Sequence, residues 1–249
     1  MNKLPVNLNA RDVRVMLLGR KTEIRRVCEP PPDEDSASVA TGISERTGAP
    51  YWKWEPRDRS TKGYMCPFGQ IGDQLFVREE WGVRTRCGGG PGSNYPGQWL
   101  GIVYRADVDS MDDVAPEQVR YVKTDPAGFD YWRDPSRWQQ WQSEWQMPQW
   151  ASRITLEIED VSLQRIQQIT GNPDYAAAEM GWEECTPGTI DFWIDPSNKS
   201  WDRHPDEDFP AWWDATYGHV AGWDWASDPF VWRLVVKVIG EPVQMGPRE

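Results

Sequence analysis

The chain has 249 residues, enough for one well-packed core, and its formal net charge is −12. Such an acidic chain does not grip a nucleic-acid duplex over its whole surface, because phosphate contacts need a basic face. It contains 17 tryptophans but no apolar run long enough for a membrane span and no signal-peptide pattern, so we expect a cytoplasmic protein with no membrane partner.

The first predicted element is a short amphipathic helix that follows Asn9, a plausible N-cap residue. Val13, Met16 and Leu17 are spaced at i, i+3 and i+4 and form one apolar stripe. Gly19 is the expected end of this helix, because glycine adopts a left-handed conformation without strain. The pattern therefore predicts a helix over residues 10–18.

Four cations follow this helix within seven residues, and residues 21–27 have the composition of a strand. A favourable charge at the helix C-terminus would account for the first cation but not for all four. A local basic region in an acidic protein suits a small anionic or polar ligand, so we predict a pocket here. The four cations are Arg20, Lys21, Arg25 and Arg26.

Later strands are predicted from turn signals and from alternating apolar residues. A Gly-Asp turn at residues 72–73 precedes a strand over residues 74–79. The clearest alternation of apolar and polar side chains covers residues 152–161. Residues 229–239 are apolar on both faces, which predicts a central strand.

A second short helix is predicted over residues 173–180. Asn172 is its expected cap, a proline occupies its first turn, and Gly181 ends it. The four cysteines of the chain form no Cys-x-x-Cys pair and are accompanied by only two histidines. This spacing favours reduced, isolated thiols, and we expect no metal and no other cofactor.

Together these elements predict an α+β protein: a small β-barrel of five or six mixed strands with short helices and long insertions. No βαβ rhythm is present. We expect one domain over residues 1–249. The predicted insertions, which are acidic, aromatic or rich in glycine and proline, lie at about residues 29–65, 82–100, 107–147 and 183–208.

Four short segments follow one another in a characteristic order. They are Gly-Arg-Lys-Thr at residues 19–22, Cys-Pro-Phe-Gly at residues 66–69, the Gly-Asp strand at residues 72–79, and a Met-Pro-x-Trp-Ala-Ser-Arg-Ile-Thr-Leu stretch at residues 147–156. In this order they resemble the ASCH domain family, whose fold is PUA-like. The similarity is greatest to phage and prophage members of that family.

The resemblance implies a barrel with a pocket beside the first helix–strand junction. Some bacterial family members are amidohydrolases that deacylate 4-acetylcytidine, and others have been regarded as RNA-binding modules or ribonucleases. Carried over by position, the catalytic lysine is Lys21 and the glutamate is Glu179. The family's threonine aligns with Ile24, which leaves Thr22 as the nearby hydroxyl. A purely structural ion pair between Lys21 and Glu179 is the alternative.

The remaining candidates would bind the ligand. Arginine side chains could hold a carbonyl oxygen or a phosphate, and tryptophan rings could stack on a base. For Arg78, which lies on a predicted strand, a buried ion pair with an acid is the alternative. The candidate ligand-binding residues are Arg25, Arg26, Arg78, Trp81, Trp150 and Arg153.

We therefore expect a protein that recognises a nucleobase, nucleoside or nucleotide in a pocket at Lys21. The specific enzymatic hypothesis is a metal-independent amidohydrolase that removes an acyl group from the exocyclic amine of cytidine or a related nucleoside. One alternative is a non-catalytic module that binds single-stranded RNA or modified DNA. Another is a phage protein-interaction factor whose acidic, tryptophan-rich insertions form the contact surface.

Overall fold

The computed structural model describes part of the chain. The predicted insertions at residues 29–65, 82–100, 107–147 and 183–208 lie in large part outside it. The described residues are 3–29, 39–43, 50–54, 63–87, 99–112, 114–115, 118–123, 140–169, 172–184, 193–194, 201–202 and 204–239.

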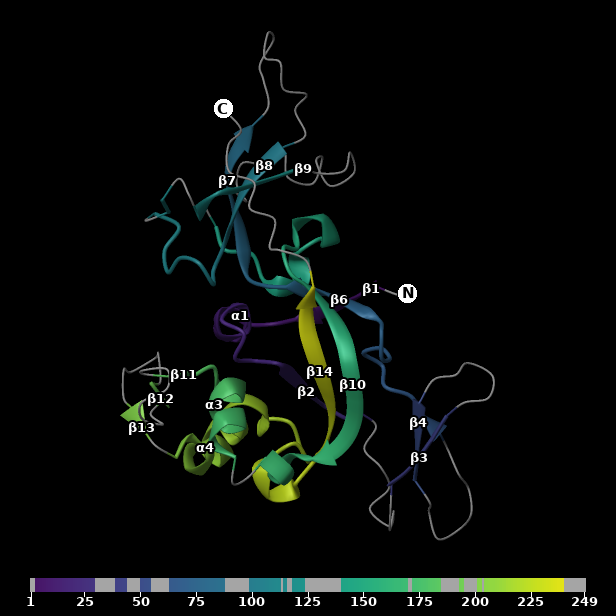
Figure 1. Cartoon of the computed structure of the whole chain (residues 1–249). Coiled ribbons are helices and arrows are strands. Elements are labelled where there is room, and N and C mark those ends of the chain that lie inside the picture. Colours follow the sequence, from purple (N-terminus) through teal and green to yellow (C-terminus); the bar gives the residue numbers. More distant parts are fainter. Residues whose placement is uncertain are drawn as a thin grey trace. The chain divides into compact units, whose positions relative to one another are not determined.

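The protein is α+β, as the sequence predicts. Its largest sheet is mixed and five-stranded, with the order β1-β6-β10-β14-β2. The last strand, β14, lies between two others, which confirms its predicted central position; Figure 1 shows the two longest strands, β10 and β14, side by side. The elements are α1 (Ala10–Leu17), α3 (Pro173–Met180), α4 (Pro205–Tyr217), β1 (Lys3–Asn7), β2 (Glu23–Val27), β6 (Gln74–Arg78), β10 (Thr155–Arg165) and β14 (Phe230–Ile239).

Three smaller sheets, each of three strands, occupy segments that overlap the predicted insertions. Their strands pair antiparallel with one another, so the backbone partners come from neighbouring segments of chain. The strands are β3 (Val39–Ile43), β4 (Pro50–Trp54), β5 (Gly63–Tyr64), β7 (Trp81–Cys87), β8 (Trp99–Tyr104), β9 (Arg120–Lys123), β11 (Glu183–Glu184), β12 (Trp193–Ile194) and β13 (Trp201–Asp202). Short 3-10 helices are η3 (Glu144–Gln146), η4 (Gln149–Ala151), η5 (Ile166–Ile169) and η6 (Trp225–Ser227).

The chain forms two compact units. The first unit comprises Met1–Asn2, Val15–Gln74 and Glu157–Lys237, and the second comprises Lys3–Arg14, Leu75–Leu156 and Val238–Glu249. Whether residues 1–249 fold as one domain stays a prediction.

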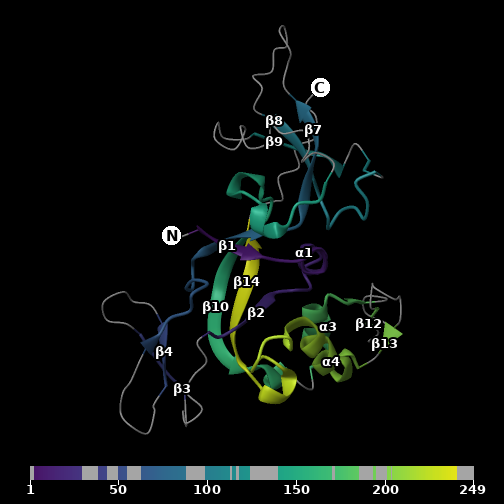
Figure 2. The same cartoon turned by 180° about the vertical axis from the view of Figure 1, so that it is seen from behind.

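In the first unit, α3 and α4 pack together over an apolar core, and both views show the two helices side by side (Figures 1 and 2). Phe209 and Trp213 of α4 are fully buried in this core, and Trp212 and Trp225 pack around Phe209. Aromatic residues bury large areas, so a few of them can hold two short helices in place. This core supports the helix that carries Glu179.

The second unit has its own core beneath the β7–β8 pair. Trp81, Val83, Ile102 and Tyr104 are fully buried there, and the Tyr104 hydroxyl donates a hydrogen bond of 2.8 Å to the carbonyl of Ala151. A buried hydroxyl needs such a partner to offset its lost hydration. Within the described residues, no helix is both long enough and apolar enough to cross a membrane.

Candidate functional site

The Gly-Arg-Lys-Thr segment connects α1 to β2 within the first unit. The Gly19 backbone is left-handed, with φ of +73°, as expected for a residue that ends a helix. The N–H of Lys21 then donates to the Val15 carbonyl at 3.3 Å, and the Thr22 carbonyl accepts from Val236 at 2.8 Å. These backbone bonds tie the segment at both ends, so Lys21 occupies a fixed position just before β2 begins at Glu23.

Glu179 lies in the last turn of α3, whose two ends are both capped. The Asn172 side chain accepts a hydrogen bond from the N–H of Tyr175 at 3.1 Å, and Gly181 is left-handed with φ of +72°. Tyr175 and Glu179 are four residues apart, so they share one face of the helix. The sequence predicts these helix bounds, Pro173–Met180, and both caps correctly.

Lys21 and Glu179 form a buried ion pair. The Lys21 Nζ lies 3.1 Å from the Glu179 Oε2, and the two side chains are only 2% and 6% exposed. Lys21 also donates to the carbonyl of Ala178 at 3.4 Å, so its ammonium sits at the C-terminal end of α3, where the helix dipole favours a cation. The pair joins the segment before β2 to a helix far along the chain.

Arg25 extends this pair into a row of alternating charges. Its Nη1 lies 3.2 Å from the same Glu179 oxygen, and its Nη2 lies 2.5 Å from the Oε2 of Glu23. The other oxygen of Glu23 contacts Arg233 of β14, whose guanidinium lies 3.7 Å from the Asp160 carboxylate. Each carboxylate in this row therefore has a cation beside it.

The charged neighbours control the ionisation of the two buried glutamates. Burial alone would raise the pKa of Glu179, but Lys21 and Arg25 outweigh it and hold this pKa below its ordinary value of 4.5. Burial is likewise the largest influence on Glu23, and the contacts with Arg233 and Arg25 again leave its pKa lowered. Both side chains are thus carboxylates at neutral pH.

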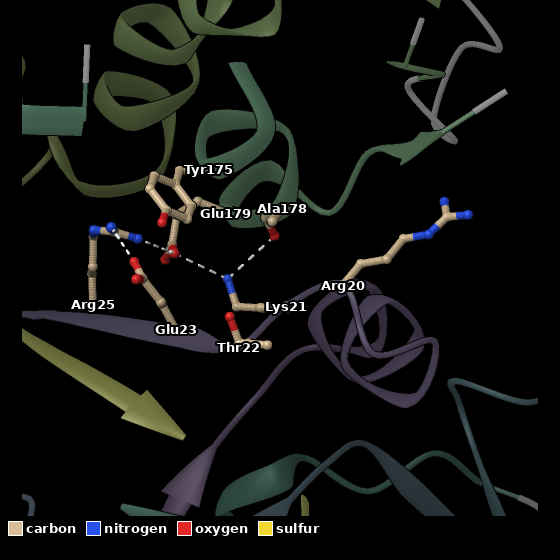
Figure 3. Close-up of a pocket in the computed structure, with 8 residues that line it drawn as sticks. All are labelled: Arg20, Lys21, Thr22, Glu23, Arg25, Tyr175, Ala178 and Glu179. Atoms are coloured by element: carbon tan, nitrogen blue, oxygen red, sulfur yellow. Dashed lines mark hydrogen bonds and ion pairs between the residues drawn. The ribbon is translucent and has the colours of Figure 1, made fainter. Parts of the chain in front are cut away.

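A small concavity lies beside this ion network (Figure 3). Thr22 is exposed at its edge, and Tyr175, which is 43% exposed, forms part of its wall. Figure 3 shows the Arg20 side chain directed away from the other labelled side chains. The lining residues are Arg20, Lys21, Thr22, Glu23, Arg25, Tyr175, Ala178 and Glu179.

The structure thus brings the three candidate catalytic residues, Lys21, Thr22 and Glu179, to one concavity together with Arg25. Arg26 is half-buried on β2, where its Nη1 donates to the carbonyl of Arg25 at 2.7 Å, and it is not among the eight lining residues. The catalytic and binding roles of these residues stay predictions.

The other four candidates belong to the second unit, where each has contacts of its own. Trp81 is fully buried and meets Trp150 edge to face, with ring centroids 6.0 Å apart, so its faces are covered by the core. The Arg78 guanidinium lies over the Phe76 ring, 5.3 Å from its centroid. The fourth candidate, Arg153, is paired with acids.

Arg153 is the centre of a second buried ion cluster. Its Nε and Nη2 donate to the two oxygens of Glu79 at 2.8 and 2.9 Å, and its Nη1 lies 2.6 Å from an Asp107 oxygen. The guanidinium also covers the Tyr104 ring, 4.1 Å from its centroid. Burial alone would lower the pKa of Arg153, but the two carboxylates raise it above its ordinary value. Arg153 is thus paired with two acids, and its role in ligand binding stays a prediction.

Two described thiols of the first unit are also buried. Burial raises the pKa of Cys28 to about 11 and that of Cys66 to about 12, so both are thiols rather than thiolates at neutral pH. Because both are protonated at neutral pH, neither has the thiolate form that acts as a nucleophile. In the described part of the chain, no group of three or more His, Cys, Asp or Glu side chains is arranged to hold a metal ion.

The sequence predictions did not include Glu23, Tyr175 or Arg233. A signal for Glu23 is present, because Lys21, Glu23 and Arg25 alternate along the chain and side chains two residues apart on a strand share a face. Tyr175 precedes Glu179 by one helical turn. Arg233 is one of two charged residues, with Lys237, in a strand that is otherwise apolar. What no local pattern gives is that β14 places Arg233 opposite Arg25.

The chain was compared with protein-family models, curated proteins and solved structures, and none of them matches it. The resemblance to the ASCH domain family therefore stays a prediction that rests on the four sequence segments that carry it.

Proposed function

We propose that this protein binds a nucleobase or nucleoside in the concavity beside Lys21 and Glu179, and that it removes an acyl group from the exocyclic amine of cytidine or a related nucleoside. The proposal includes a PUA-like fold of the ASCH type, in which the five-stranded sheet closes into a small barrel. The order of the four sequence segments supports this assignment.

One observation carries the proposal: an ammonium and a carboxylate are held 3.1 Å apart at the edge of a concavity. Amide hydrolysis needs a group that accepts a proton from water, a positive charge or donor for the developing oxyanion, and a proton for the leaving amine. Glu179 and Lys21 together offer these functions. The Thr22 hydroxyl, exposed at the same edge, is a further polar group for the ligand.

Because its pKa is lowered, Glu179 is a carboxylate at neutral pH and is the group of this pair that can accept a proton. The Glu179 carboxylate takes a proton from water as the water oxygen bonds to the acyl carbon, and the Lys21 ammonium stabilises the oxyanion. The carbon–nitrogen bond then breaks while Glu179 returns the proton to the exocyclic nitrogen. The products are a free carboxylic acid and the amine of the nucleoside, and neither a metal nor a redox step is required.

A second function is favoured by the burial of the same ion pair. With side chains only 2% and 6% exposed, Lys21 and Glu179 are already satisfied by each other. Opening such a pair is unfavourable, because each charge would lose its partner in a poorly solvated place. The concavity could then bind a base or nucleoside without turnover. Arg25, which is paired with two carboxylates, is poorly available to an RNA phosphate.

The purified full-length protein distinguishes these functions when it is incubated with 4-acetylcytidine and analysed by chromatography. The hydrolase predicts release of cytidine and acetate, abolished in Lys21→Ala and in Glu179→Gln. A matched control is Lys237→Ala, an exposed lysine of the same unit, which should retain full turnover. Binding of the nucleoside by calorimetry without any release would identify the non-catalytic binder. Absence of both binding and release would reject the proposed ligand class.

A further inference from the structure

Two arginines face each other across the β2–β14 pair. Arg25 and Arg233 are directly opposite in the antiparallel register, which places two like charges on adjacent strands. Such cross-strand pairs are unfavourable unless a counter-charge separates them. Glu23 supplies this counter-charge, because one of its oxygens contacts Arg25 at 2.5 Å and the other contacts Arg233.

The same contacts fix the direction of the Arg25 guanidinium. One terminal nitrogen is held by Glu23, and the other lies 3.2 Å from Glu179. Arg25 and Glu23 are both buried, with side chains 3% and 7% exposed, so water does not readily replace either contact. Arg233 holds the far side of Glu23 and is itself held by Asp160 at the more exposed end.

We propose that Glu23, fixed by Arg233, is a positioning residue that holds Arg25 against Glu179 and so keeps the Glu179 carboxylate beside the concavity. We call this set of contacts, from Arg233 through Glu23 and Arg25 to Glu179, the clamp. Its use in catalysis rests on the proposed function, whereas the contacts themselves need no ligand. Glu23 acts through Arg25 and has no part in the reaction.

A positioning role can be separated from a simple effect of charge. The charged or titratable groups around Glu179 are Lys21, Arg25 and Arg26 from the β2 segment, Tyr175 on α3, and, through Glu23, Arg233 and Asp160. Removing the negative charge of Glu23 would by itself lower the pKa of Glu179, because one like charge disappears. Releasing Arg25 would raise this pKa, because an opposite charge moves away. The two explanations therefore predict shifts of opposite sign.

The test is a carboxyl-carbon NMR titration of Glu179 in the full-length protein without ligand, with circular dichroism defining the pH range in which it stays folded. In Glu23→Gln, the Glu179 resonance should titrate about one pH unit higher than in the wild type, so more of it is protonated at any given acidic pH. The matched control is Asp160→Asn, which removes a carboxylate from the exposed end of the same row of charges and should leave the titration unchanged.

A second variant keeps the negative charge at residue 23 and changes only the length of the side chain. Glu23→Asp is one methylene shorter and cannot bridge both arginines, so the clamp again predicts an upward shift, whereas a pure charge effect predicts none. Equal or lower protonation of Glu179 in both variants at the same pH would overturn the inference. If the wild type releases no cytidine and the titration of Glu179 moves to higher pH in both variants, the clamp is supported and the hydrolase proposal is rejected. If the wild type releases cytidine and the titration of Glu179 is unchanged in both variants, the hydrolase proposal is supported and the clamp is rejected.

Discussion

Within the described residues, the ion cluster around Arg153 and the one around Glu179 differ in how their charges are arranged. Arg153 in the second unit uses its Nε and both terminal nitrogens on two acids and also covers an aromatic ring. In the first unit, the charges are spread over a row of side chains, and the Arg25 Nε has no hydrogen-bond partner among the described residues. Of these two clusters, the row contributes Lys21, Glu23, Arg25 and Glu179 to the lining of the concavity.

From this difference, we interpret the Arg153 cluster as structural and the cluster around Glu179 as the candidate site. The Arg153 guanidinium places all three of its nitrogens against acids, so it is poorly available to a ligand. The cluster around Glu179 adjoins two exposed residues, Thr22 and Tyr175, at the concavity. Substitutions in the two clusters, and a change to acidic pH, test this difference.

The largest effect is expected from Arg153→Met. Glu79 would remain buried without its cation, which should lower the free energy of unfolding by about 3–5 kcal/mol in urea denaturation. Adding Glu79→Gln to the same variant removes the stranded charge and should restore part of the loss. A loss below about 1 kcal/mol would show that the cluster is not a structural fixture.

A smaller loss is expected from Lys21→Met in the first unit. Glu179 would lose one cation but keep Arg25, so we expect unfolding to become easier by about 1–3 kcal/mol. Lys237→Met, at an exposed position of the same unit, should change stability by less than about 0.5 kcal/mol. If Lys21→Met were as damaging as Arg153→Met, the two clusters would be equally structural.

The third prediction concerns acid. The folded-state pKa values of Glu23 and Glu179 lie below the ordinary 4.5. Between the folded and unfolded pKa values the unfolded chain binds more protons, so their contribution is fully present above about pH 4.5 and is lost as the pH falls below it. Each carboxyl should account for up to about 1.4 kcal/mol per pH unit in this window. Urea denaturation from pH 6 to acid should give a shallower slope for Glu179→Gln, and an unchanged slope would contradict the assignment.

The smallest effect on stability is expected from Tyr175→Ala. Its ring is 43% exposed at the concavity, so the free energy of unfolding should change by no more than about 0.5 kcal/mol. If the ring stacks on a nucleobase, the same variant should weaken nucleoside binding about tenfold in calorimetry. A clear loss of stability without a loss of binding would show that Tyr175 stabilises the fold and does not contact the ligand.

The sequence by itself determined the local elements that position the site. The cap at Asn172, the left-handed Gly181, the end of α1 at Gly19 and the central last strand are all confirmed, because caps, glycines and apolar periodicity act over a few residues. The α+β class follows from the same signals. The pairing of strands in the three small sheets that overlap the predicted insertions was not predicted, since hydrogen bonds between strands are not encoded in the local pattern of either strand.

Only the tertiary structure decided which charges meet. Arg25 pairs with Glu23 and Glu179 because of the register between β2 and β14 and the position at which α3 packs. No local sequence pattern predicts either of these. The same applies to Arg153, which the sequence offers as a ligand-binding residue and which the fold pairs with Glu79. Ion pairs act over a few ångströms in space, so their partners are fixed by how the chain packs.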